Sequence, residues 1–122
     1  MRPRVLLVDD QAAFRALARQ LLESDGFTVV GEAGDAASAL RAARRLAPDV
    51  VLLDVRLPDA SGVTAAKLIR DGHPAPLVVL TSTADYAHAV RGCDAQGFIP
   101  KALLSGPMLR TVLAHALESD PP

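Results

Sequence analysis

Five residues whose side chains could do chemistry stand directly after short apolar stretches of this sequence. They are two adjacent acids, a third acid, a threonine and a lysine: Asp9, Asp10, Asp54, Thr81 and Lys101. Brought together, carboxylates can hold a divalent cation or act as a nucleophile, a hydroxyl can donate a hydrogen bond, and an ammonium can neutralise developing charge. Each residue alone has an ordinary alternative, such as a helix cap, a strand end or a solvated charge. The chemistry therefore depends on whether the fold brings the five to one place.

The apolar stretches before these residues have the composition of strands, and we predict strands over 4–8, 27–31, 50–54, 77–80 and 98–99. The third is the clearest, because four consecutive apolar residues run into an acid, as expected of a strand that is covered on both faces. Parallel strands end at the same edge of a sheet, where the loops diverge and ligands bind. We therefore expect the five side chains to meet at that edge.

The segments between the strands carry apolar residues at spacings of three and four, which predicts helices. One helix covers 11–24, a second is capped by Asp35 and ended by Pro48, a third covers 61–70, and the last begins after Ser105. Strands that alternate with helices are typical of the α/β class. The pattern predicts a doubly wound five-stranded parallel sheet with helices on both faces.

Length and composition indicate a single domain over residues 1–122, with 119–122 as a frayed tail. Half of the residues are apolar, and 13 Lys and Arg against 14 Asp and Glu give a formal charge of -1. That balance argues against direct nucleic-acid binding. The single cysteine, Cys93, predicts no internal disulfide, and no apolar run has the length of a membrane span or a signal peptide. We expect a cytoplasmic protein with no membrane partner.

Three clustered carboxylates require a counter-charge. Two such charges 4 Å apart repel by about 1 kcal/mol in water and by about 4 kcal/mol at an intermediate dielectric constant. Lys101 supplies one positive charge. Mg2+ could balance the remaining negative charge, because it accepts a few carboxylate and carbonyl oxygens as ligands and keeps several waters. A metal ion, an ammonium and a hydroxyl would form a site for a phosphoryl group, with a carboxylate in line as the nucleophile.

These residues and their order resemble the receiver domain of response regulators in two-component signalling. The resemblance covers essentially the whole chain. It rests on four motifs at strand ends: Asp9-Asp10, Asp54 with Pro58 and Gly62, Thr81-Ser82, and Phe98-Ile99-Pro100-Lys101. It implies a flavodoxin-like fold with the strand order 2-1-3-4-5.

The resemblance also implies a role for each acid. Asp54 would be the phosphoacceptor. Asp10 and Asp54 would bind Mg2+ directly, together with the backbone carbonyl of Arg56. Asp9 would act mostly through a metal-bound water.

The remaining roles concern the phosphoryl group and the switch. A histidine kinase or a small phosphodonor would phosphorylate Asp54, and water would later remove the group, so that the chain is no enzyme beyond these self-catalysed steps. Thr81 and Lys101 would contact the phosphoryl oxygens, and Phe98 would turn inward as the Thr81 side moves. The face formed by the last two strands and helices would then control dimerisation or the binding of an effector protein.

One departure from the family pattern concerns this output face. The stretch 84–91 is helix-like but short, and the interval between Thr81 and Lys101 is slightly shorter than is usual in the family. We expect a truncated or irregular helix there, with the chemistry intact.

Three other classes of protein share parts of this pattern. An aspartate-nucleophile phosphatase usually has a second acid two residues after the nucleophile, where this chain has Arg56. A flavin-binding domain needs a phosphate cradle, but the first loop is Asp9-Asp10-Gln11, and its acids would repel a phosphate. A receiver-like interaction module that is never phosphorylated stays open, because the site residues alone do not show that a kinase uses them.

Overall fold

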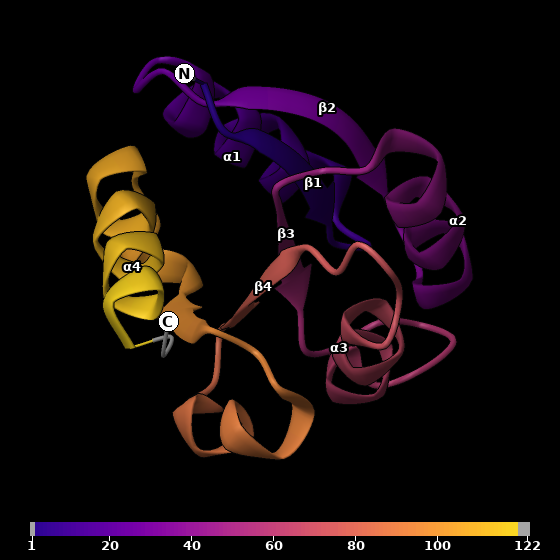
Figure 1. The fold of residues 1–122 in the computed structure, drawn as a ribbon. Coiled ribbons are helices and arrows are strands. Elements are labelled where there is room, and N and C mark those ends of the chain that lie inside the picture. Colours follow the sequence, from indigo (N-terminus) through magenta and orange to yellow (C-terminus); the bar gives the residue numbers. More distant parts are fainter. Residues whose placement is uncertain (1, 120–122) are drawn as a thin grey trace.

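A five-stranded parallel sheet forms the centre of the molecule, and the computed structural model describes it within residues 2–119 (Figure 1). The strand order is β2-β1-β3-β4-β5, as predicted. The strands are β1 Arg4–Val8, β2 Thr28–Ala33, β3 Val50–Asp54, β4 Leu77–Ser82 and β5 Gly97–Pro100. Of the predicted tail over 119–122, Ser119 still belongs to the last helix, and the rest lies outside the described residues.

The second strand is longer than the predicted range 27–31. Its pairing with β1 shifts by one residue between Val5 and Leu6, so that Val5 lies opposite Val29 and Leu6 opposite Gly31. This irregularity lets β2 continue beside β1 as far as Ala33. The apolar pattern did not reveal the added positions because they hold a glutamate and a small alanine, Glu32 and Ala33.

Four α-helices cover the two faces of the sheet, which confirms the doubly wound prediction. They are α1 Ala12–Glu23, α2 Ala36–Leu46, α3 Gly62–Arg70 and α4 Gly106–Ser119. Helices α2 and α3 pack on the face that carries Leu6, Val51 and Leu53, and α1 and α4 pack on the face that carries Leu7 and Leu52. Neighbouring residues of β3 thus enter two different cores, which explains its unbroken apolar sequence. None of the described helices has the length and apolar character needed to cross a membrane.

Side-chain caps fix where α2 and α3 begin, and the cap at Asp35 was predicted from the sequence. The Asp35 carboxylate accepts a 2.8 Å hydrogen bond from the Ser38 N–H, and the Ser61 hydroxyl accepts one of 3.1 Å from the Val63 N–H. These bonds satisfy backbone donors that the first turn of a helix leaves free. The helices therefore start at fixed positions relative to the strand ends.

The start of α4 depends on Ser105, whose hydroxyl accepts a 3.0 Å hydrogen bond from the Met108 N–H. We expect Ser105→Ala to lower the free energy of unfolding by about 1 kcal/mol, because a backbone donor loses its partner. Urea titration measures the change. Ser24→Ala is the control, since the Ser24 hydroxyl only donates to the Leu21 carbonyl at the exposed end of α1. Equal losses in the two variants would contradict a specific capping role.

The segment between β4 and β5 forms two single 3-10 turns, over Ala87–Ala89 and Arg91–Cys93, in place of an α-helix. The expectation of a truncated or irregular helix over 84–91 is thus confirmed. The Ser82 hydroxyl accepts the Ala84 N–H at 3.1 Å, and the Asp85 carboxylate accepts the Ala87 N–H at 3.0 Å. Such local bonds compete with helix formation, and a short helix has too few backbone bonds to offset its nucleation.

Candidate functional site

The carboxyl ends of β1, β3 and β4 bring the predicted side chains to one edge of the sheet. Asp54 ends β3 and lies directly opposite Thr81 of β4, and Asp9 follows β1. Asp9, Asp54 and Thr81 are 2%, 4% and 1% exposed. Asp10 lies beside them and is exposed. The edge therefore holds buried carboxylates with one acid open to solvent.

Lys101 directly follows β5, the strand at the edge of the sheet, and its side chain reaches two of these acids. Its Nζ lies 2.6 Å from Asp9 Oδ2 and 3.0 Å from Asp54 Oδ2, and the side chain is 11% exposed. The same ammonium lies 4.6 Å from the centre of the Phe14 ring of α1. This cation–π contact was not predicted, because in the sequence Phe14 is only one member of an apolar helix face. The ammonium is therefore held between two carboxylates and an aromatic ring.

Burial and charge act in opposite directions on these groups. Burial raises the pKa of the Asp54 carboxyl, and although the Arg56 N–H and Lys101 favour the charged form, the nearby Asp9 charge disfavours it and the pKa stays raised. Burial by itself would lower the pKa of Lys101, but its ion pairs with Asp9 and Asp54 outweigh that and raise the pKa. Lys101 is thus firmly cationic, while Asp54 carries an incompletely compensated charge.

The donor set fits a hard divalent cation. Oxygens of Asp9, Asp10 and Asp54 lie within 4.8 Å of one another. The buried Asp9 Oδ2 forms its 2.6 Å ion pair with Lys101 but accepts no hydrogen bond within residues 2–119. Carboxylate oxygens with unused lone pairs are the ligands that Mg2+ prefers. The Arg56 N–H donates to Asp54 Oδ1 at 3.1 Å, so the Arg56 backbone lies directly beside this cluster.

Gly62 allows the loop after β3 to fold back against Asp54. Its N–H donates a 2.6 Å hydrogen bond to the Val55 carbonyl, and a Cβ at this position would lie 2.1 Å from the Asp54 carbonyl oxygen. Only a glycine fits without displacement. Arg56 and Ser61 also form an isolated antiparallel bridge across the loop. The loop therefore holds Asp54 in a defined position.

Asp59 ties this loop to α2, which the sequence did not predict. Its two carboxylate oxygens accept hydrogen bonds of 2.8 and 3.0 Å from the backbone N–H groups of Ala36 and Ala37. An acid caps a helix here from 23 residues away, so no local spacing in the sequence signals it. The bonds lower the pKa of the Asp59 carboxyl.

We expect the contribution of Asp59 to depend on pH. Because its pKa is lower in the folded state than the ordinary value of 3.8, its contribution is complete above that value and is lost as the pH falls through the folded-state pKa. Thermal melts should show Asp59→Ala less stable than wild type at pH 7, with the difference shrinking below pH 3.8. Asp71→Ala is the control, since it removes an exposed carboxylate to which no described residue donates a hydrogen bond. A difference independent of pH would refute the charged cap.

The predicted switch residues lie on adjoining strands. Phe98 is half-buried, lies opposite Leu80 in the β4–β5 register, and packs against the core on the α2 and α3 face. Thr81 is the next residue of β4 and lies opposite Ile99. Thr81 and Phe98 thus lie one residue apart in the β4–β5 register.

The fold and the site together define an α/β receiver of the flavodoxin-like type. The family model for the response regulator receiver domain matches residues 5–113. The chain belongs to this family, and the predicted family resemblance is confirmed.

Curated relatives are regulators of longer chain length. The transcriptional regulatory protein YdfI of Bacillus subtilis is 33% identical over 112 residues, which are 89% of this chain and 53% of YdfI. The transcriptional regulatory protein PdtaR of Mycobacterium tuberculosis is 37% identical over 100 residues, 80% of this chain and 49% of PdtaR. The chain thus spans about half the length of these two relatives.

A methylesterase is also among the relatives. A protein-glutamate methylesterase/protein-glutamine glutaminase of Hahella chejuensis is 38% identical over 86 residues, but these are only 25% of its length. The response regulator domain of CheB from Thermotoga maritima superposes with a TM-score of 0.82 at 32% identity, covering 99% of this chain and 100% of that domain. The likeness thus concerns a receiver domain.

A second solved structure covers the chain equally well. It is a two-component response regulator of the LuxR family from Aurantimonas, with a TM-score of 0.86 and 29% identity over 97% of this chain and 87% of the other. The receiver fold therefore extends over the described residues as a whole.

Proposed function

We propose that the chain accepts a phosphoryl group on Asp54 from a histidine kinase or a small phosphodonor and uses it to control partner binding. The observation that carries this proposal is the Lys101 ammonium, 3.0 Å from Asp54 and 2.6 Å from Asp9 at the sheet edge. An ammonium in this place can neutralise charge on a transferring phosphoryl group. The chain would catalyse no reaction beyond transfer of the phosphoryl group to Asp54 and its hydrolysis from Asp54.

Asp54 would act as the nucleophile. One of its carboxylate oxygens forms a bond to phosphorus while the bond between phosphorus and the donor breaks, and the donor leaves with the electron pair. The Arg56 N–H, already bonded to Asp54 Oδ1, orients the carboxylate for attack. Lys101 and Thr81 then contact the phosphoryl oxygens, whose added charge is about -1.5 to -2.

Asp9, Asp10, Asp54 and the backbone carbonyl of Arg56 would hold Mg2+. When bound, the ion supplies positive charge against the phosphoryl oxygens and offsets the repulsion between the acids. The oxygens of Asp9, Asp10 and Asp54, which lie within 4.8 Å of one another, support this assignment.

The output would pass through the last two strands and helices. A phosphoryl group that draws Thr81 toward itself vacates space for the half-buried Phe98, and the face formed by β4, β5 and the helices beside them changes. Couplings of this kind are typically about 1 to 3 kcal/mol. A second copy of the chain, forming a homodimer, or an effector protein would bind to that face. The adjacency of Thr81, Leu80 and Phe98 in the register supports the path.

The proposed roles also imply a cellular location and a domain assignment. A receiver that takes its phosphoryl group from a kinase works in the cytoplasm, and we assign residues 1–122 to one receiver domain, without direct contact to nucleic acid or membrane. The near-neutral charge of -1 supports that assignment.

Intact-mass measurement tests the proposal. Wild-type protein incubated with acetyl phosphate and Mg2+ should gain one phosphoryl group, and a chelator should prevent the gain. Peptide mapping should place the group on Asp54. No gain, under conditions that label another receiver, would favour an interaction domain that is never phosphorylated.

A further inference from the structure

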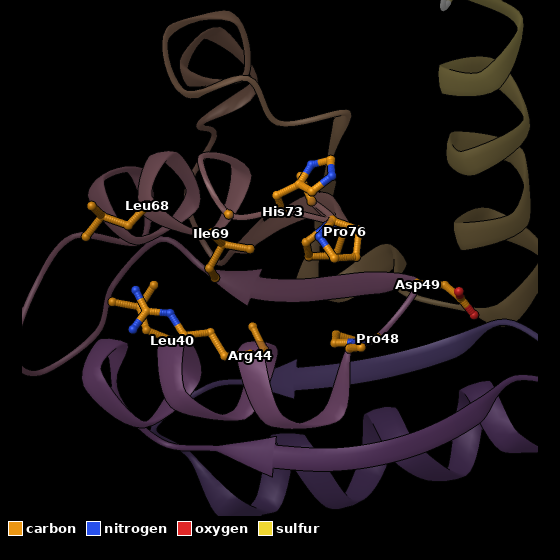
Figure 2. Close-up of a pocket in the computed structure, with 13 residues that line it drawn as sticks. Leu40, Arg44, Pro48, Asp49, Leu68, Ile69, His73 and Pro76 are labelled. Carbon is orange, nitrogen blue, oxygen red and sulfur yellow. The ribbon is translucent and has the colours of Figure 1, made fainter.

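A groove lies at the end of the sheet opposite Asp54, between the C-terminal ends of α2 and α3 (Figure 2). It has a volume of about 350 Å3 and is open to solvent on one side. Its floor and walls come from the two helix ends and from the loops that lead into β3 and β4. The groove is thus separated from the phosphoryl site by the length of β3, about 3.3 Å for each residue.

The walls of the groove are largely apolar, with His73 as a polar residue among them. Leu40 of α2 and Leu68 of α3 face it from opposite sides, and Leu68 is 50% exposed. Pro48, Pro74 and Pro76 form the loop side. Proline fixes its own backbone angle, so this wall loses little freedom when something binds. Half-exposed leucine beside a preformed hollow is a surface that gains from being covered.

The loop wall is also fixed from behind by Arg70. Its Nη1 donates a 2.9 Å hydrogen bond to the Pro76 carbonyl, which anchors the loop to α3. The groove is therefore a property of the folded chain and does not need a ligand to form.

The charge of the groove is asymmetric. Arg44 lines it, is exposed, and forms no ion pair with any residue of the described range. Arg41 lies one helical turn before it. The acid among the lining residues, Asp49, lies at the end away from Leu40 and Leu68 (Figure 2), and its carboxylate already accepts the Arg4 N–H at 2.7 Å. An unpaired guanidinium thus stands beside the apolar hollow.

We propose that this groove docks a segment of a partner protein that carries a large apolar anchor residue and a neighbouring acid. The anchor fills the hollow between Leu40 and Leu68, and the acid pairs with Arg44. A small ligand is a poorer fit, because the groove is open to solvent and would leave part of such a ligand in water. An amphipathic segment has the required pattern, since apolar residues and acids recur along it. Because the groove lies at the far end of the sheet, its occupation does not require phosphorylation.

Selection from a random peptide library displayed on phage tests this docking site. Enriched peptides should combine a Leu- or Phe-type residue with Asp or Glu. Fluorescence anisotropy should then show binding to wild type and to Asp54→Ala alike. Arg44→Glu and Leu68→Gln should each weaken the same peptides by about tenfold or more, the effect expected of a central contact.

The matched controls are Arg45→Glu and Leu17→Gln, which change an exposed arginine and an exposed leucine outside the groove. They should leave affinity within about twofold of wild type. Peptides without acids, binding that survives the two groove variants, or no enrichment at all would overturn the proposal. Self-association that Arg44→Glu abolishes would also overturn it, because the occupant would then be a second copy of this chain. Circular dichroism establishes that all variants are folded.

Discussion

Asp54→Asn should abolish phosphoryl uptake and at the same time raise the stability of the metal-free protein at pH 7. The loss follows because the amide has no nucleophilic oxygen to offer. The gain in stability follows because burial raises the pKa of the Asp54 carboxyl, so that the charged form is disfavoured in the folded state. Asparagine keeps an acceptor for the Arg56 N–H and removes that charge.

The pH dependence of this gain has a defined sign. A carboxyl whose folded pKa is raised above its ordinary value of 3.8 destabilises the fold progressively as the pH rises from that value through the raised pKa. The melting temperatures of Asp54→Asn and wild type should therefore agree at low pH and diverge toward neutrality. Both melts are recorded with a chelator present.

Asp71→Asn serves as the control, because it makes the same change at an exposed position. It should retain phosphoryl uptake and melt as wild type does. Labelling of Asp54→Asn would place the acceptor elsewhere. A lower melting temperature of Asp54→Asn at pH 7 would show that the pairing with Lys101 outweighs burial.

Gly62→Ala should lower the free energy of unfolding by about 3 kcal/mol, at the upper end of the usual cost of overpacking. The added Cβ would lie 2.1 Å from the Asp54 carbonyl oxygen and 2.7 Å from the Val55 Cα. Both neighbours are backbone atoms of a buried strand end, so they cannot move aside as a flexible side chain could. The start of α3 must shift instead, and Asp54 shifts with it.

Gly92→Ala provides the comparison, because a Cβ there would meet nothing within 4 Å. Urea titration should show a change of less than about 0.5 kcal/mol for this variant. Similar stability of the two alanine variants would show that the loop after β3 is more pliable than its contacts indicate. Gly62→Ala should also slow phosphoryl uptake in the intact-mass experiment.

Much of the site was predictable because, in a parallel sheet, the residues that follow the strands come together at one edge. Asp9, Asp54 and Thr81 each follow an apolar run, and once the runs are strands of one parallel sheet, their ends must meet. Lys101 could be placed by the same reasoning. The helix caps Asp35 and Ser105 depend on residues only three positions away, which a sequence displays directly.

The features that the sequence did not predict depend on contacts between residues that lie far apart in the sequence. The Asp59 carboxylate caps α2 from another loop, and Phe14 contacts Lys101 from α1. Neither has a local signal, because the partner is not near in sequence. The continuation of β2 to Ala33 depends on a shift in pairing with β1 that apolar periodicity does not encode.

The two 3-10 turns between β4 and β5 affect the free energy that a conformational change in this segment would require. Single turns hold few backbone hydrogen bonds, and of the residues in them only Cys93 is buried. A segment of this kind has a low free energy of local opening. The edge beside β5 is therefore compliant, while the loop after β3 is stiff. Under the proposed function, a rearrangement near Thr81 would not have to melt a helix first, so a small coupling energy would be enough to change the face that a partner binds.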